Sequence, residues 1–218
     1  IITSYNQAET LHQYASTGIY EIRIGGEISG WQFNDYGDDD KIIEINNWGP
    51  LRFIPNDSSI FKGCSNLDVT ATDSLTLESD NGHRMFHNTK LGSKGDMNPW
   101  DTSNAVTMYQ MFIDITGFNQ PIGDWDTSSV TTMQQMFRKY TGGMTFDQDI
   151  GNWDVGNVTT FHGMFFADHN YNAFNNGGSP SISGWDTSSC TNMQEMFRNC
   201  SGFNQPIGNW DTSKVTNM

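Results

Sequence analysis

The chain has 218 residues, of which 35% are hydrophobic, and a formal net charge of −14. This charge argues against nucleic acid as a partner, since that affinity comes from Lys and Arg neutralising phosphates, and it equally disfavours an anionic membrane surface. No apolar run reaches the roughly 18 residues that mark a membrane-spanning helix, so we expect no membrane insertion in this segment.

The first 47 residues contain no repeat and are predicted to form a β-rich N-terminal cap. Residues 19–25 and 41–45 alternate apolar with polar residues, as half-buried strands do, and residues 28–33 are a third candidate strand. We expect this cap to cover the apolar end of a repeat region that occupies residues 48–218. The domain organisation is therefore 1–47 and 48–218.

An acidic segment within this cap is a candidate calcium site. It contains Asp35, Asp38, Asp39 and Asp40 within six residues. Hard cations such as calcium bind clustered oxygen ligands. The spacing is not that of an EF-hand, however, and a solvated acidic loop explains the same residues. Both interpretations stay open, and no other cofactor is expected.

Residues 48–218 contain about six related units. The clearest copies are residues 125–137 and 185–197, both beginning Trp-Asp-Thr-Ser-Ser, and Gly-Phe-Asn-Gln-Pro-Ile-Gly occurs at 117–123 and 202–208. The Phe that ends the Met-x-x-Met-Phe motif recurs at intervals of 25 to 32 residues. The extra residues fall at roughly 138–146 and 166–184, always between this Phe and the next Trp. Periodicity of this length predicts a solenoid in which each unit packs on its neighbours.

One unit is predicted to contain a short helix and a short strand. Val130, Met133, Met136 and Phe137 have a spacing that suits a helix with one apolar face. The polar residues 126–128 stand where side chains could cap its first turn. Residues 203–210 are interpreted as a short extended segment. The predicted fold class is therefore an α+β repeat solenoid, truncated at the C-terminus, because the chain stops within a repeat.

The recurring residue types favour structural roles over catalysis. The Trp, Met and Phe stripes are interpreted as core, and the Asn and Gln rows either bond to one another or bind a partner. The three Cys fall on repeat positions, which indicates buried apolar thiols, although a disulfide between Cys190 and Cys200 is left open. His83 and His87, four residues apart, could bind zinc if helical, but no third ligand recurs nearby. A motif repeated in every unit is a poor candidate for a single active site, so the chain is not expected to be an enzyme.

The insertion at residues 166–176 is the most individual stretch of the chain. It contains His169, Tyr171, Asn172 and Phe174, residue types that often recognise a ligand. Function tends to lie on loops that a rigid scaffold holds in place, so these four residues are candidate ligand-binding residues. Neutral variation of the insertion is the alternative.

Together these motifs resemble the BspA-like family of bacterial surface repeats. Residues 61–69 match its Phe-x-Gly-Cys-Ser unit, and residues 100–112, 125–137, 153–165, 185–197 and 210–218 match its Trp-Asp-Thr-Ser unit. Phe161, which replaces the first Met, is one departure. The resemblance implies a leucine-rich-repeat-like solenoid on secreted, surface-anchored or virion proteins associated with adhesion, and it supplies no catalytic residues. Residues 12–22 separately resemble the last strand of a PKD-type module.

We therefore expect a non-enzymatic protein that is extracellular or lies on a cell or virion surface. Its function would be binding or adhesion to a protein or glycan on another cell or surface. The alternative is a structural component of a surface appendage, sheath or virion fibre that acts through self-assembly.

Overall fold

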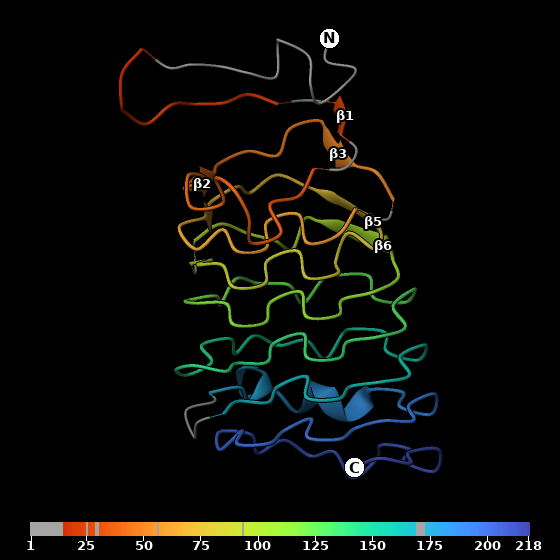
Figure 1. Ribbon diagram of the computed structural model, residues 1–218. Coiled ribbons are helices and arrows are strands. Elements are labelled where there is room, and N and C mark those ends of the chain that lie inside the picture. Colours follow the sequence, from red (N-terminus) through yellow and green to blue (C-terminus); the bar gives the residue numbers. More distant parts are fainter. Residues whose placement is uncertain (1–14, 25, 29–30, 56, 93, 169–172) are drawn as a thin grey trace.

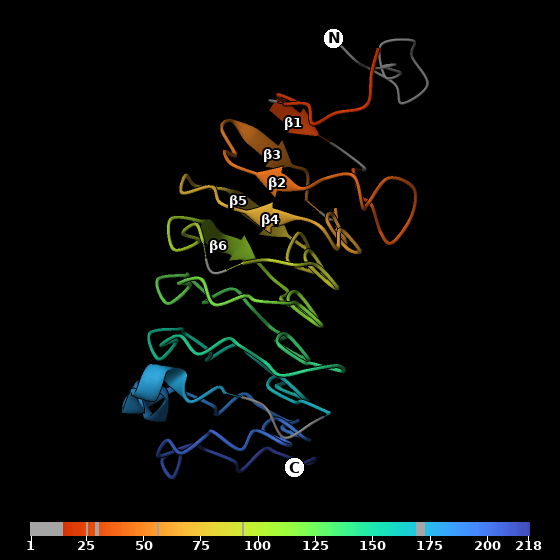
Figure 2. The ribbon, with the colours of Figure 1, turned by 90° about the vertical axis from the view of Figure 1, so that its left-hand side faces the viewer.

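The computed structural model describes residues 15–24, 26–28, 31–55, 57–92, 94–168 and 173–218. The repeat units form layers that follow one another in sequence order along one axis (Figures 1 and 2). Each unit contributes one layer, and its backbone bonds to residues about one repeat away, as Phe112 N does to Met136 O at 2.9 Å and Phe137 N to Met164 O at 2.9 Å.

Regular secondary structure is sparse and lies mostly in the first half of the chain. The strands are β1 (Gly26–Ile28), β2 (Glu44–Ile45), β3 (Leu51–Phe53), β4 (Asp68–Val69), β5 (Thr76–Ser79) and β6 (Asp101–Ala105). They form three two-stranded parallel sheets, β1 with β3, β2 with β4, and β5 with β6. Later layers are joined by isolated parallel bridges, which connect Thr107, Thr132, Thr160, Asn192 and Asn217 in turn.

The prediction of an α+β, leucine-rich-repeat-like solenoid is wrong. The described residues contain no α-helix, and their helical turns are the short 3-10 segments η2 (Asn176–Gly178) and η3 (Pro180–Gly184). The strands amount to three short parallel pairs rather than one strand per unit. The predicted strand at 19–25 is also wrong over its described part, because residues 19–24 form no strand there, and Ile19 and Ile22 are exposed.

The segment predicted to be helical is a series of tight turns, which we call the turn segment of each layer. Met136 N bonds to Met133 O at 3.2 Å and Arg138 N to Gln135 O at 3.2 Å, which are three-residue turns. Between them Gln135 has φ +57°, and the equivalent residues of the other layers are also left-handed: Ser59, Arg84, Gln110, Gly163 and Glu195. A left-handed residue interrupts a right-handed helix. The apolar spacing of three misled the helix prediction, because consecutive turns also point every third side chain inward.

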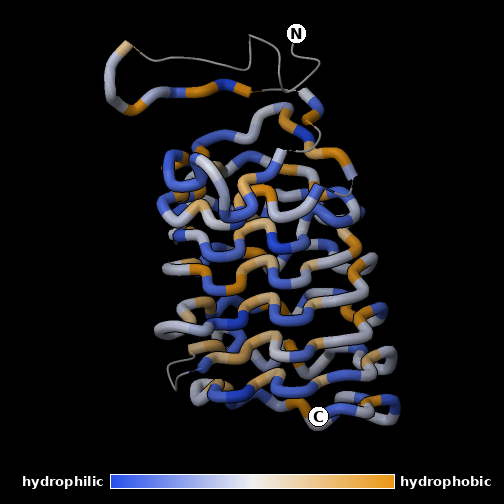
Figure 3. The backbone as a smooth tube through the Cα atoms, in the orientation of Figure 1, coloured by the Kyte–Doolittle hydropathy of each residue, from blue (hydrophilic) through white to orange (hydrophobic). Residues whose placement is uncertain are grey.

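The core is a set of aligned side chains that runs through all the layers. The Phe rings stack at 5.5 Å between Phe112 and Phe137 and at 5.6 Å between Phe137 and Phe165. Trp100 and Trp125 stack at 5.9 Å. The expectation that the Trp, Met and Phe stripes form the core is confirmed, and apolar stretches of successive layers lie above one another in Figure 3.

The Trp-Asp-Thr-Ser motif makes a polar contact at each position. Trp125 Nε1 donates to Met97 O of the preceding layer at 2.7 Å, and Thr127 Oγ1 donates to Asp154 O of the following layer at 2.8 Å. Asp126 Oδ1 accepts from Ser128 N at 3.0 Å, which is an Asx turn rather than a helix cap. Similar bonds recur in other layers, at Trp153, Trp185, Trp210, Thr102 and Thr187. The predicted helix cap is therefore replaced by an Asx turn at the Asp and by hydrogen bonds between layers at the Trp and the Thr.

The Asn row of the Phe-Asn-Gln segments is also structural. Asn119 Oδ1 accepts from Asp147 N at 2.8 Å, Asp147 Oδ1 from Asn175 N at 2.7 Å, and Asn175 Oδ1 from Asn204 N at 2.8 Å. Each carboxyl or amide thus satisfies a backbone donor of the next layer. Of the two roles considered for these rows, hydrogen bonding between layers is confirmed.

Close approach of the layers gives the first testable prediction. A Cβ on Gly123 would lie 2.6 Å from Asp149 O of the next layer, whereas a Cβ on Gly184 would meet nothing within 4 Å. We expect Gly123→Ala to lower the free energy of unfolding by about 1–3 kcal/mol, because the backbone must move to accommodate the methyl group. Gly184→Ala is the matched control and should change it by less than about 0.5 kcal/mol. Urea unfolding measures both, and equal values would contradict this packing.

Candidate functional site

Of the four predicted ligand-binding residues of the insertion, only Phe174 lies within the described residues. His169, Tyr171 and Asn172 lie outside the described residues. Phe174 is fully buried, and its ring stacks 3.8 Å from that of Phe165, measured between centroids. Its side chain therefore packs in the core.

The predicted calcium ligands are partly engaged in ion pairs. Asp35 Oδ2 lies 2.7 Å from Lys62 Nζ, and Asp40 Oδ1 lies 2.6 Å from Lys41 Nζ. With Asp38 and Asp39, these residues do not form a metal centre here, because no group of three or more His, Cys, Asp or Glu in the described residues could hold a metal ion. Calcium binding stays a prediction.

His83 and His87 lie in a turn segment rather than a helix. The ring of His83 contacts that of Tyr109 edge-on at 5.0 Å, and His83 Nε2 and His87 Nδ1 are buried without a hydrogen-bond partner in the described residues. Burial lowers the pKa of both imidazoles, and the neighbouring Arg84 lowers it further. Both residues are therefore neutral near pH 7.

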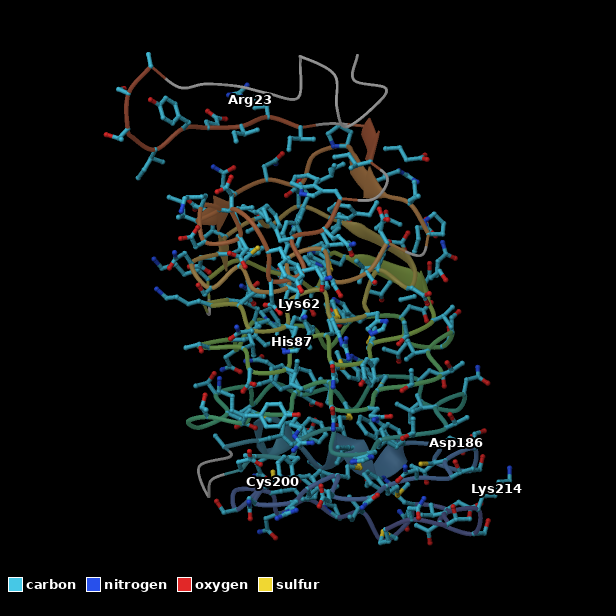
Figure 4. The ribbon with its side chains drawn as sticks, viewed as in Figure 1. Arg23, Lys62, His87, Asp186, Cys200 and Lys214 are labelled. Carbon is cyan, nitrogen blue, oxygen red and sulfur yellow. The ribbon has the colours of Figure 1, made fainter. Side chains whose placement is uncertain are left out.

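The surface built by the turn segments collects most of the basic side chains of the repeat region. We call it the turn face and define it as residues 59–62, 83–87, 109–114, 134–140, 162–168 and 194–198. It holds five of the eleven Lys and Arg of the chain: Lys62, Arg84, Arg138, Lys139 and Arg198. Its acidic residues are Asp114, Asp168 and Glu195. Figure 4 shows Lys62 and His87 one above the other in the middle of the view.

Three arginines of the turn face are held against aromatic rings. The guanidinium carbon of Arg138 lies 4.3 Å from the ring centroid of Tyr140 and 4.2 Å from that of Phe166. Arg198 covers Phe166 at 5.1 Å, and Arg84 covers Tyr109 at 5.3 Å. Phe166 is only 2% exposed, although it occupies the outward position that Arg138 and Arg198 occupy in neighbouring layers. Cation–π contacts of this kind fix the guanidinium planes.

Two buried amide side chains, those of Gln110 and Gln135, continue the repeat position of Arg84 in the next two layers. Arg84 Nε donates to Gln110 Oε1 at 2.8 Å, and Gln110 Nε2 donates to Gln135 Oε1 at 2.5 Å. Lys139 is buried, and its Nζ donates to Asp114 O at 2.9 Å. Burial lowers the pKa of Lys139. The side chains that hold the face in place thus come from successive layers.

The edge that carries the Trp-Asp-Thr-Ser motif has the opposite charge. Its aspartates each accept a bond from the residue two positions on: Asp101, Asp126, Asp154, Asp186 and Asp211. Bonds from the hydroxyl and the backbone N–H of Ser128 lower the pKa of Asp126, and the backbone and hydroxyl of Ser188 lower that of Asp186. Asp186 lies at this edge in Figure 4, to one side of the turn face. This edge therefore carries one aspartate per layer, whereas the turn face carries five basic residues beside three acidic ones.

Comparison with known proteins identifies the family. The family described as "Mycoplasma protein of unknown function, DUF285" matches residues 80–179 and 146–218, which together cover well over half of the chain. The chain belongs to the DUF285 family. The two matches overlap, as expected when the matched pattern itself repeats. No curated protein and no solved structure matches the chain. Among the described residues of this DUF285 chain, no helix has the length and apolar character needed to cross a membrane.

The cysteines give the second prediction. Cys64, Cys190 and Cys200 are buried and free, so the interpretation as apolar thiols is confirmed and the structure contains no bond between Cys190 and Cys200. Burial raises the pKa of Cys64 and of Cys200 to about 12. Because the thiolate is the reactive form, we expect slow labelling by Ellman's reagent at pH 8 in the native protein and rapid labelling of three thiols in guanidinium. Rapid labelling of native protein would contradict this burial.

The buried imidazoles give the third prediction. The pKa of His83 and of His87 lies below the ordinary 6.5 in the folded state, so the unfolded chain binds more protons as the pH falls. The free energy of unfolding should therefore decrease as the pH is lowered from 7 through 6.5 toward about 5. Lys62 and Arg84 strengthen the effect at these imidazoles, and nearby carboxylates oppose it.

Urea titrations at each pH measure this dependence. The double variant His83→Gln/His87→Gln should have a shallower slope over the same range, because neither glutamine titrates. An identical slope in both proteins would rule out these histidines as its source.

Proposed function

We propose that this DUF285 chain is a non-enzymatic binding module that attaches to a protein or glycan on another cell or surface. The observation that carries the proposal is the turn face, where arginines from several layers are held in place by aromatic rings and by the buried amide of Gln110. Such groups are enriched where proteins recognise partners. Calcium or another cofactor is not part of this mechanism.

The layered backbone supports such a role because it holds the surface rigidly. Every interior turn segment bonds to the layers on both sides, as Gln135 N does to His162 O and Gln110 N to Gln134 O. Side chains on a pre-organised scaffold lose little conformational freedom on binding, which favours affinity. The resemblance to BspA-like surface repeats points the same way, toward adhesion and a location outside the cell or on its surface or that of a virion.

A structural role is the second candidate and would involve an appendage, sheath or virion fibre that self-assembles. The observation in its favour is the layered backbone itself, in which equivalent residues of successive layers pair in parallel, as Thr132 does with Thr160 and Thr160 with Asn192. Repetition of this kind suits an elongated structural element.

A binding assay separates the two candidates and gives the fourth prediction. We expect the labelled chain to bind saturably to intact cells, and to one component of an array of glycans and matrix proteins, while it stays monomeric in sedimentation velocity. An acidic protein of equal size and charge is the control for non-specific adhesion. Concentration-dependent assembly without saturable binding would favour the structural role and contradict our proposal.

A further inference from the structure

We propose that the turn face binds an acidic polysaccharide, whose carboxylate or sulfate groups contact the guanidinium groups of Arg84, Arg138 and Arg198. This inference rests on the proposed function and names the ligand class and the surface that binds it.

The placement of the arginines suits an elongated ligand. Arg138 and Arg198 each follow the Phe of their layer, so they share one repeat position with a single layer between them, roughly 10 Å along the stack. Arg84 precedes Phe86 by two residues and stands at the repeat position of Gln110 and Gln135, to one side of the other two. A chain of sugars with acidic groups can follow Arg138 and Arg198 and reach Arg84 beside them.

Each guanidinium group makes internal contacts that orient it and leave other N–H donors unused, as at Arg84, whose Nε alone donates to Gln110. Arg138 lies between Tyr140 and Phe166, and its ion pair from Nη2 to Asp168 Oδ1 is 4.0 Å long. Its side chain is 17% exposed, and its Nε is buried without a hydrogen-bond partner in the described residues. Arg198 leaves 56% of its side chain exposed while pairing with Glu195. An exposed pair of this kind contributes little stability and can be exchanged for a ligand.

The planar fork of arginine is suited to this ligand chemistry. It donates two parallel hydrogen bonds to a carboxylate, and its weakly hydrated face can stay on an aromatic ring at the same time. The turn face also exposes Gln134, His162 and Gln194, together with the acidic residues Asp114, Asp168 and Glu195. Amide and imidazole groups both donate and accept hydrogen bonds, so they suit sugar hydroxyls.

A peptide fits the turn face less well. Peptides commonly add as a strand to a free sheet edge or place apolar anchors in a groove. Along the turn face the backbone donors and acceptors of the interior layers are used by neighbouring layers, as for Phe112, Phe137 and Phe165. An apolar hollow in the last described layers includes Arg198 in its lining, but it does not extend along the turn face to Arg138 or Arg84.

Nucleic acid is disfavoured by charge density. Binding to a duplex requires many Lys and Arg close together, whereas the turn face has widely spaced arginines on a chain of net charge −14. At physiological ionic strength the Debye length is about 8 Å. The acidic Trp-Asp-Thr-Ser edge is then largely screened, and direct contacts at the turn face dominate.

Titration calorimetry on the full chain in about 0.15 M salt tests this inference. The probes are dextran sulfate and polygalacturonate, which distinguish sulfate from carboxylate, with neutral dextran, polyglutamate and single-stranded DNA as comparisons. We expect saturable binding to at least one acidic polysaccharide, weaker binding at higher salt, and no binding to neutral dextran.

Matched variants locate the site. Arg84→Gln/Arg198→Gln should weaken polysaccharide binding by about tenfold or more, because bonds to charged groups are lost. Arg138→Lys keeps the positive charge but loses the planar pair of guanidinium donors, so it should also weaken binding. Thermal unfolding of this variant checks that it is still folded. Arg52→Gln/Lys214→Gln removes the same charge elsewhere and should change affinity less than about twofold.

Three results would overturn the inference. Equal affinity for polyglutamate or DNA would mean that the chain binds polyanions without selecting sugars. Equal losses in the face and control variants would mean that overall charge, not the turn face, decides binding. Saturable binding to a neutral glycan or a protein alone would overturn this ligand class but leave the proposed function intact, whereas failure to bind any cell or array component would remove the proposed function itself.

Discussion

The alternation of backbone hydrogen bonds in the turn segment is the constraint on which the rest of the structure depends. Gln135 N and Phe137 N donate to His162 O and Met164 O of the next layer, while the N–H groups of Met136 and Arg138 close local turns. A buried N–H without a partner is costly, so every donor must take one of these two routes. The left-handed residue between the two turns directs alternate donors along the stack.

This alternation fixes the register of the layers, and the register aligns the core. Once the backbones are bonded, each Phe lies over the Phe of the preceding unit, with centroids 5.5–5.9 Å apart from Phe86 to Phe197. Extra residues can enter only where no such alignment is required. The segments η2 and η3 indeed lie between the Met-Phe pair and the next Trp of their unit.

The same constraint explains which features of the fold the sequence could predict. Repeat register, the inward Trp, Met and Phe, and the buried Cys depend on which residues recur, and a sequence displays recurrence directly. The helix was wrongly predicted because three-residue spacing fits both a helix and successive turns. Gln110, Gln135 and Glu195 gave no sign of a left-handed backbone, and only Gly163 among the later units hinted at it. The Asp of each unit resembled a cap because an Asx turn uses the same side-chain oxygen.

The candidate site could not be predicted from any single unit. It consists of residues at the same repeat position in successive layers, which we call a column. The insertion at residues 166–176 departs most from the repeat, yet its Phe174 continues the core stack between Phe146 and Phe203. By contrast, Arg138 is unremarkable within its own unit. It becomes informative when placed beside Phe166 and Arg198, the residues at the same position in the next two layers.

Inward positions of a layer must match their neighbours, but outward positions need not. The column after the Phe contains Lys62, His87, Ile113, Arg138, Phe166 and Arg198. Stability alone does not require positive charge there, since Ile113 occupies the same position and is fully buried. A chain in which acidic residues exceed basic ones by 14 nevertheless places three of its five arginines on this face, beside Asp114, Asp168 and Glu195. One aspartate from each of five layers lies along the Trp-Asp-Thr-Ser edge instead. Packing does not account for this placement of the arginines, and the proposed binding of an anionic polymer is a reason for it.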